Sequence, residues 1–186
     1  MRAIWKPGET WDPTLELLGS YVLRREEPER LAEPKARAFS AAWDTYDPGI
    51  SVELNDSVLR GDWFDQLASI RLAHLRNVKL QAGTDKRSPY NPFAGLSLHW
   101  ELEHLVAAGL ATLEVLRIAT KDAAETLGAQ EDLGTIEAGR LADVVLLDKN
   151  PLEDIKNTQT IWRVVRGGWL FDPDDLRPPT PSDMPK

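Results

Sequence analysis

The sequence contains no cysteine, which excludes disulfide bonds, zinc sites built on thiolates and a cysteine nucleophile. Long apolar runs are also missing. None approaches the roughly 18 residues that a membrane-spanning helix needs, and residues 1–8 carry no apolar core of a signal peptide. As the chain stands, we expect a soluble, cytoplasmic polypeptide without a membrane partner, while a longer parent protein could be exported.

Basic residues are outnumbered, with 22 Lys+Arg against 30 Asp+Glu and a net charge of −8. The one tight basic cluster, Arg24-Arg25, is followed at once by two glutamates. Proteins that bind nucleic acids use clustered positive charge to neutralise phosphates, so we expect no nucleic-acid partner. Hydrophobic residues make up 42% of the chain, which is enough to form a core.

Several sequence motifs that carry chemistry are absent. There is no phosphate-binding glycine loop, no Gly-x-Ser-x-Gly turn, no His-x-His and no His-Glu-x-x-His. His99 and His104, two of only three histidines, would lie about 140° apart on a helix and would not converge on one ion. Glu101 and His104 have the spacing of a di-metal helix bundle, but that site needs carboxylates from partner helices, and the sequence indicates none. A solvated helix face is the favoured interpretation of this pair.

Proline marks the ordered part of the chain, because only three of the 13 prolines lie between residues 49 and 172. Residues 60–172 are therefore expected to hold the regular structure, and residues 173–186 a proline-rich tail. Apolar spacing and glycine positions predict helices over 63–75, 98–107, 112–119 and 120–127, a strand over 78–85, a buried strand over 142–147, and a hairpin of 161–166 with 169–171. Helices alternating with a strand, followed by a β-rich end, indicate an α/β protein with a separate small sheet.

Asp85 is the principal candidate for chemistry. It ends the predicted strand 78–85, and ligands of α/β proteins gather at the carboxyl ends of strands. Gly83, two residues earlier, permits close approach of the backbone. Aspartate is also a common turn or helix-capping residue at strand ends, so position alone leaves both interpretations open.

The Ala-Gly-Thr-Asp sequence at 82–85 opens a longer set of matching segments. The others are 95–102, 106–110, 119–120, 123–128, 133–148, 150–155 and 164–168. Together these segments resemble the carboxyl-terminal part of the amidohydrolase superfamily, most closely its imidazolonepropionase-like and prolidase-like branch. The resemblance covers residues 78–172, more than half of the chain.

The resemblance implies a (β/α)₈ barrel with one or two divalent metals, zinc in the first place, and a small β-sandwich domain. Asp85 matches the aspartate that binds metal and moves a proton from the hydrolytic water to the leaving group. His99 matches a position at the start of the last barrel helix, where helix packing explains a histidine equally well. The implied substrate is a small molecule with an amide or cyclic amide bond.

The other metal ligands of the family have no counterpart, and a whole barrel takes about 250 residues. We therefore expect the last one or two β/α units of a barrel over 1–128, with the seventh strand near 11–15, and strands of the β-sandwich domain over 129–172. The expected function is metal-dependent hydrolysis of carbon–nitrogen bonds in the parent. This chain alone is expected to be inactive and to hold no metal. The alternative is an inactive remnant or an assembly module, partnered by the missing amino-terminal half or by a second copy.

Overall fold

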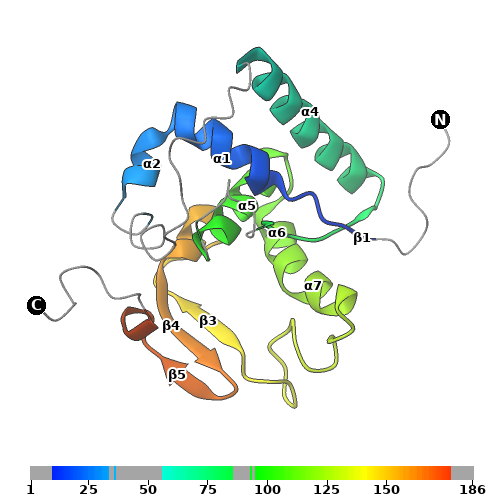
Figure 1. Ribbon diagram of the computed structural model, residues 1–186. Helices are drawn as coiled ribbons and strands as arrows, with labels where there is room; N and C mark the ends of the chain where they lie inside the picture. The colour runs from blue at the N-terminus through cyan, green and yellow to red at the C-terminus, as the bar shows by residue number, and fades with distance from the viewer. Residues whose placement is uncertain (1–9, 34–35, 37–55, 86–92, 94, 177–186) are drawn as a thin grey trace, which may run out of the picture.

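The computed structural model describes residues 10–33, 36, 56–85, 93 and 95–176. In this part of the chain, helices form the body of the molecule, and a three-stranded sheet lies at one end (Figure 1). A second sheet consists of two short parallel strands. The chain is thus an α/β protein with a small antiparallel sheet, as the sequence predicts.

The parallel pair joins β1 (Thr10–Trp11) to β2 (Lys79–Leu80). Between them lie α1 (Leu15–Glu26), α2 (Pro28–Ala32) and α4 (Asp56–Leu75). The ladder continues past the strands, because the Gln81 amide donates to the Trp11 carbonyl at 2.9 Å. Both strands therefore end at the same edge of this small sheet.

Three predicted elements of this region differ in extent, and the strand expected over 78–85 is limited to Lys79–Leu80. The strand expected over 11–15 is limited to Thr10–Trp11, because Pro13 cannot donate to a ladder and helix α1 begins at Leu15. Helix α4 begins at Asp56 instead of 63. On its surface Trp63, Leu67 and Ile70 face the core, whereas Phe64 is 65% exposed, because position 64 lies about 100° around the helix from position 63.

Three helices follow β2: α5 (Leu96–Ala107), α6 (Thr112–Ala119) and α7 (Lys121–Thr126). Their ends confirm the glycine predictions, since Gly109 and Gly128 adopt φ of 94° and 69° just beyond α5 and α7. Thr112 is the first residue of α6, and the preceding Ala111 amide donates to Glu114 Oε2 at 3.0 Å.

The antiparallel sheet contains β3 (Val144–Leu147), β4 (Ile161–Arg166) and β5 (Trp169–Phe171), in that order. A 3₁₀ helix, η1 (Ile155–Gln159), joins β3 to β4, and another, η2 (Pro173–Leu176), follows β5. The predicted hairpin is confirmed: Gly167 and Gly168 form the turn with positive φ. Asp143 Oδ1 accepts a 2.6 Å hydrogen bond from the Gly167 amide and fixes that turn.

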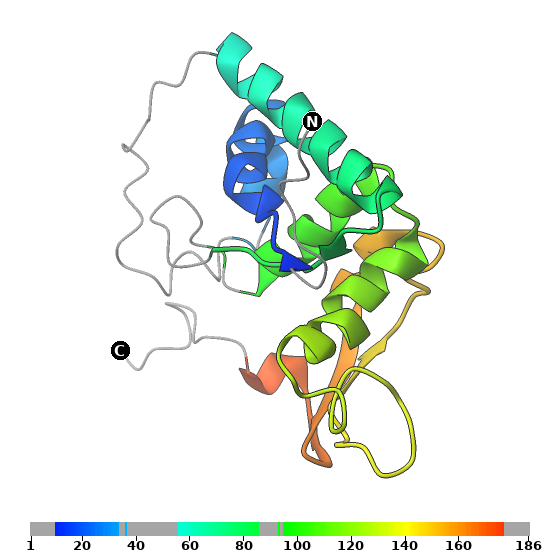
Figure 2. The same cartoon turned by 90° about the vertical axis from the view of Figure 1, so that its right-hand side faces the viewer.

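The main core forms where α1, α4, α5 and α6 meet β2 and η1. Its fully buried members include Leu15, Ile70, Leu105 and Val115. A smaller cluster of Leu23, Ala36, Phe93, Leu96 and Trp100 lies beside it. Figure 2 shows the three-stranded sheet lying away from the amino-terminal helices. The helical body therefore holds most of the buried apolar surface.

Strand 142–147 is not the buried strand that its apolar sequence indicates. Val145 is 53% exposed, and in the same sheet Trp169 and Leu170 are 75% and 64% exposed. A run of apolar residues shows that a strand can be covered, but the packing of other elements decides whether it is covered. The sheet therefore presents an apolar surface that is exposed to solvent.

We expect this surface to drive self-association. The purified chain should elute as oligomers by size-exclusion chromatography with light scattering, because exposed apolar patches associate in water. Replacing Trp169 and Leu170 by Lys and Glu should shift the distribution toward the monomer. A single monomeric species with a cooperative melt would contradict this expectation and show a self-sufficient unit.

Candidate functional site

Asp85 lies five residues beyond β2, at the edge where β1 and β2 end. Its side chain is exposed and its φ is 43°, in the left-handed region. Aspartate and asparagine enter this region more readily than other residues with a Cβ. The backbone therefore turns at Asp85 and leaves its carboxylate open to solvent.

Asp12 is a second carboxylate at the same edge, and the sequence analysis missed it. It directly follows β1, and a Cβ built on Gly83 would lie 2.0 Å from Asp12 Oδ2. The carboxylate thus fills the space that Gly83 leaves empty, two residues before Asp85. Asp12 Oδ1 also accepts hydrogen bonds of 3.2 Å from the amide and hydroxyl of Thr14. The rule that selected Asp85, an aspartate after a strand, selects Asp12 as well once β1 is recognised.

Glu101 lies on α5 and is completely buried. Its Oε2 accepts a 2.6 Å hydrogen bond from the amide of Glu16. Burial raises the pKa of Glu101 to about 8; the backbone amides of Glu16 and Leu15 oppose this, and the charge of Asp12 adds to it. Glu101 Oε1 is buried without a hydrogen-bond partner among the described residues, so an ionised carboxylate is poorly compensated there.

His104, one helical turn along α5 from Glu101, contacts the side chain of Glu16. Its Nε2 lies 2.9 Å from Glu16 Oε2, and Trp63 packs edge-on at 4.9 Å between ring centroids. Burial, and secondarily the charge of Arg30, lowers the pKa of His104 to about 3, so the imidazole is neutral at pH 7. The contact is therefore a hydrogen bond of a neutral ring with a carboxyl group.

The prediction of a solvated face for Glu101 and His104 is wrong. Both side chains are buried, and Glu16 of α1 is the partner carboxylate that the sequence did not indicate. The cluster is nonetheless no metal centre: the described residues contain no group of three or more His, Cys, Asp or Glu placed to hold an ion. Glu101 directs its accepting oxygen to backbone amides instead.

His99 lies near the start of α5 and contacts the carboxyl-terminal part of the chain. Its Nδ1 is 2.9 Å from Thr158 Oγ1 of η1, and that hydroxyl donates to the Ile155 carbonyl at 2.8 Å. The contact accounts for a histidine at this position through packing of α5 on η1.

The stability of the fold should depend on pH through this cluster. Below pH 4.5 the unfolded chain binds a proton at histidine that folded His104 excludes, so the free energy of unfolding should rise from pH 3 to 4.5. Between pH 4.5 and 6.5 the proton that folded Glu101 retains opposes this effect. Between pH 6.5 and 8 Glu101 acts alone, and the free energy of unfolding should fall by on the order of 2 kcal/mol.

Urea unfolding at pH 6.5 and pH 8 measures this difference, because Glu101 acts alone in this window. Glu101→Gln should remove most of it, because glutamine does not titrate. Glu103→Gln, two residues along the same helix, should leave the difference in place. An unchanged pH dependence in Glu101→Gln would show that another group titrates.

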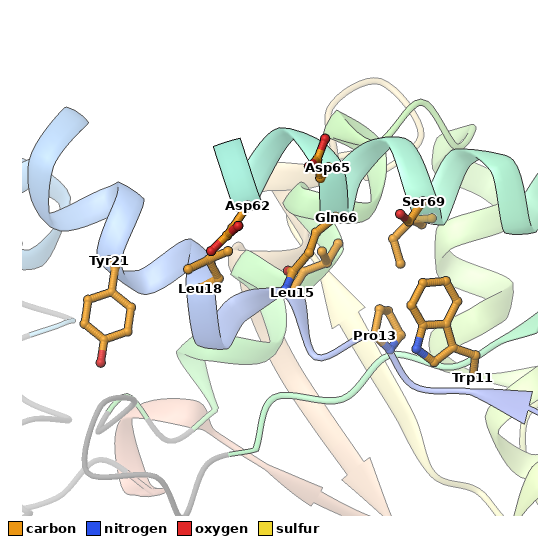
Figure 3. Close-up of a pocket in the computed structure, with 10 residues that line it drawn as sticks. Trp11, Pro13, Leu15, Leu18, Tyr21, Asp62, Asp65, Gln66 and Ser69 are labelled. Atoms are coloured by element: carbon orange, nitrogen blue, oxygen red, sulfur yellow. The ribbon is translucent and has the colours of Figure 1, made fainter. Parts of the chain in front are cut away.

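A pocket of about 760 Å³ lies between α1 and α4 (Figure 3). Trp11, Pro13 and Leu18 contribute apolar surface, while Asp62 points toward α1 and Asp65 away from it. Asp85 is not among the described residues that line this pocket. The hollow therefore adjoins the end of β1, where Trp11 and Pro13 flank Asp12, but Asp85 does not line it.

Comparison with known proteins decides the family. The family model described as "Amidohydrolase family" matches residues 57–170, which include β2, Asp85 and the three-stranded sheet. The chain belongs to the amidohydrolase family. Enzymes of this family are generally metal-dependent hydrolases, and the prediction from the residues of 78–172 is confirmed at this level.

Relatives of this amidohydrolase chain include an ochratoxinase of Aspergillus niger, 37% identical over 105 residues, which are 54% of this chain and 21% of the ochratoxinase. An adenine deaminase of Rubrobacter xylanophilus is 26% identical over 102 residues, covering 53% of this chain and 17% of the deaminase. The chain thus spans about a fifth of the curated relatives it matches.

Solved structures share the fold over nearly the whole chain. A putative prolidase from Bifidobacterium longum superimposes with a TM-score of 0.61 at 24% identity, over 88% of this chain and 35% of the prolidase. The A. niger ochratoxinase gives a TM-score of 0.60 at 25% identity, over 89% and 32% of the two chains. These similarities show that the fold is shared.

In the described ranges, no helix of this amidohydrolase is both long and apolar enough to cross a membrane.

Proposed function

We propose that this chain forms the last two β/α units of an amidohydrolase barrel together with part of its β-sandwich domain. In this proposal β1 and β2 are the seventh and eighth strands and α4 and α5 the helices that follow them, all within 1–128. Residues 129–172 belong to the sandwich, and 173–186 form the tail. The parallel pairing of β1 with β2, across a connection that contains helices, supports the assignment.

The proposed activity is hydrolysis of a carbon–nitrogen bond in a small amide or cyclic amide. The observation that carries it is the position of Asp85, exposed and five residues beyond the second of two parallel strands, within the segment that matches the family. There Asp85 accepts a proton from the attacking water and returns it to the leaving nitrogen. The names of two relatives, a Xaa-Pro dipeptidase and an adenine deaminase, both denote cleavage of carbon–nitrogen bonds.

A divalent metal, zinc in the first place, would supply activated water in such an enzyme. The described residues do not fit a complete site, because a hydrolytic zinc uses about three protein ligands and no such group of side chains converges within these ranges. We propose that Asp85 contributes one carboxylate and that strands outside the described residues contribute the rest.

We expect the isolated chain to retain less than stoichiometric zinc after dialysis, because one carboxylate holds an ion weakly. Metal analysis by mass spectrometry, with Asp85→Asn as the matched variant, measures this. Stoichiometric zinc that is lost in Asp85→Asn would show that the chain forms a complete site by itself.

The function itself is tested by complementation. The chain is co-expressed with the first six β/α units of a prolidase-like relative, and the purified complex is assayed with amides, cyclic amides and dipeptides. Hydrolysis that neither part shows alone supports the proposal. A stable, metal-loaded complex without hydrolysis of any of these substrates contradicts it.

The exposed apolar surface of the three-stranded sheet favours a second candidate, an inactive module that assembles with other chains. In that case a complex would form without gaining activity. Comparison of complex formation with turnover separates the two candidates.

A further inference from the structure

The start of α1 lacks the usual cap from its own residues. Thr14, the residue before the helix, has φ of 48° and makes no capping hydrogen bond with its side chain. The first amides of a helix have no partner within the helix, and leaving them unpaired in a buried place costs free energy. Leu15 and Glu16, which begin α1, are both fully buried, so their amides need a partner from elsewhere.

Glu101 of α5 supplies that partner across 85 residues of sequence. Its carboxylate accepts a hydrogen bond from the Glu16 amide at 2.6 Å, and the Leu15 amide lies close enough to favour its ionised form. His104, on the same face of α5 three residues later, contacts the Glu16 side chain at 2.9 Å. Glu101 and His104, three residues apart on α5, thus bind Glu16 of α1, Glu101 through its main-chain amide and His104 through its side chain.

Glu16 lies close in sequence to the candidate site. The loop from β1 to α1 contains Asp12 and Thr14, and the position of this loop depends on the position of the first residues of α1. Asp12 Oδ1 binds the Thr14 amide, and the Asp12 carboxylate occupies the space above Gly83. Gly83 in turn precedes Asp85 by two residues. Contacts therefore link Glu101 to the start of α1 and Asp12 to Gly83, and short stretches of chain join Glu16 to Asp12 and Gly83 to Asp85.

We propose that Glu101 and His104 are positioning residues, which hold the β1–α1 loop against Gly83 and so fix the edge that presents Asp85. The assignment deepens the proposed function and rests on it, because Asp85 matters for chemistry only there. Neither residue is placed to touch the substrate, since both are buried between α1 and α5. Their effect on Asp85 passes through Glu16, Asp12 and Gly83.

Amide hydrogen exchange on the full chain tests the contact of Glu101 with the start of α1 without any assay of activity. In Glu101→Ala, exchange at the amides of Leu15 and Glu16 should accelerate at least tenfold more than exchange in the core of α5. Glu101→Gln should restore most of the protection, because its side-chain oxygen can still accept. Glu103→Ala is the matched control: Glu103 binds Arg30 and Gln159 and should leave Leu15 and Glu16 protected.

Nuclear magnetic resonance then follows the contact path. The Gly83 and Asp85 resonances should shift in Glu101→Ala, return toward the wild-type positions in Glu101→Gln, and remain unchanged in Glu103→Ala. If Glu101→Ala does not fold, the Glu16 side-chain contact is tested in His104→Gln by the same resonances. Unchanged Gly83 and Asp85 signals in the folded variants, or equal shifts in the Glu103 control, would overturn the proposal. Neither result depends on whether the complemented enzyme hydrolyses an amide.

Discussion

Asp85→Asn should reduce hydrolysis by the complemented enzyme by about a hundredfold to ten-thousandfold, the usual range for loss of a general base. Asparagine has the shape of aspartate but cannot accept the proton of the attacking water. It also tolerates the left-handed backbone at this position, where φ is 43°, so the loss should not come from strain. Turnover number, melting temperature and bound metal are measured together for this reason.

Asp143→Asn and Asp148→Asn are the controls for Asp85→Asn. Asp143 fixes the hairpin turn through its bond to the Gly167 amide, and both residues flank or end β3, far along the chain from the strand ends. These variants should change melting temperature more than turnover. If Asp85→Asn keeps near-normal turnover with metal bound, Asp85 is only a turn residue and the proposed mechanism is wrong.

Gly19→Ala should destabilise the fold by about 1–3 kcal/mol, the cost of overpacking a core. Gly19 lies in α1 against the buried imidazole of His104, and a Cβ there would be 2.2 Å from Nε2 and 2.7 Å from Cδ2. The ring cannot retreat freely, because Trp63 packs edge-on against it and Glu16 binds its Nε2. The gain of about 1 kcal/mol in helix propensity is too small to offset the clash.

Gly61→Ala is the matched variant, because Gly61 is in the helical, exposed part of α4 with nothing within 4 Å of its added Cβ. It should stabilise the fold by roughly 0.5–1 kcal/mol. Urea unfolding of the two variants side by side separates packing from propensity. A stabilised Gly19→Ala would show that α1 and α5 lie farther apart than described.

The features that the sequence predicted well are those set by local chemistry. The turn at Gly167-Gly168 and the helix ends at Gly109 and Gly128 depend on the φ freedom of one residue type, which a single position reveals. In each case the deciding interactions lie within a few residues of sequence. The catalytic role of Asp85 stays a prediction, and the strand before it ends at Leu80, five residues earlier than the motif indicated.

The features that the sequence did not predict depend on distant partners. Glu101 and His104 are ionisable residues on a helix. Nothing near them in the sequence indicates that both bind Glu16, which precedes Glu101 by 85 residues and His104 by 88. The exposed face of β3 shows the reverse error, since an apolar strand was expected to find cover. Asp12 was missed because β1 has two residues, too few for an alternating pattern.

The cap that α5 provides for α1 also affects the order of folding. A helix normally closes its first turn with a neighbouring side chain, within nanoseconds to microseconds. Here the acceptor lies 85 residues downstream, which a ribosome takes roughly 4–17 seconds to add at about 5–20 residues per second. The nascent α1 must therefore wait, uncapped, for α5 to emerge, and its docking closes a long loop with the entropy cost that such loops carry. Slow, late protection of the Leu15 and Glu16 amides in pulse-labelled refolding would be the kinetic sign of this dependence.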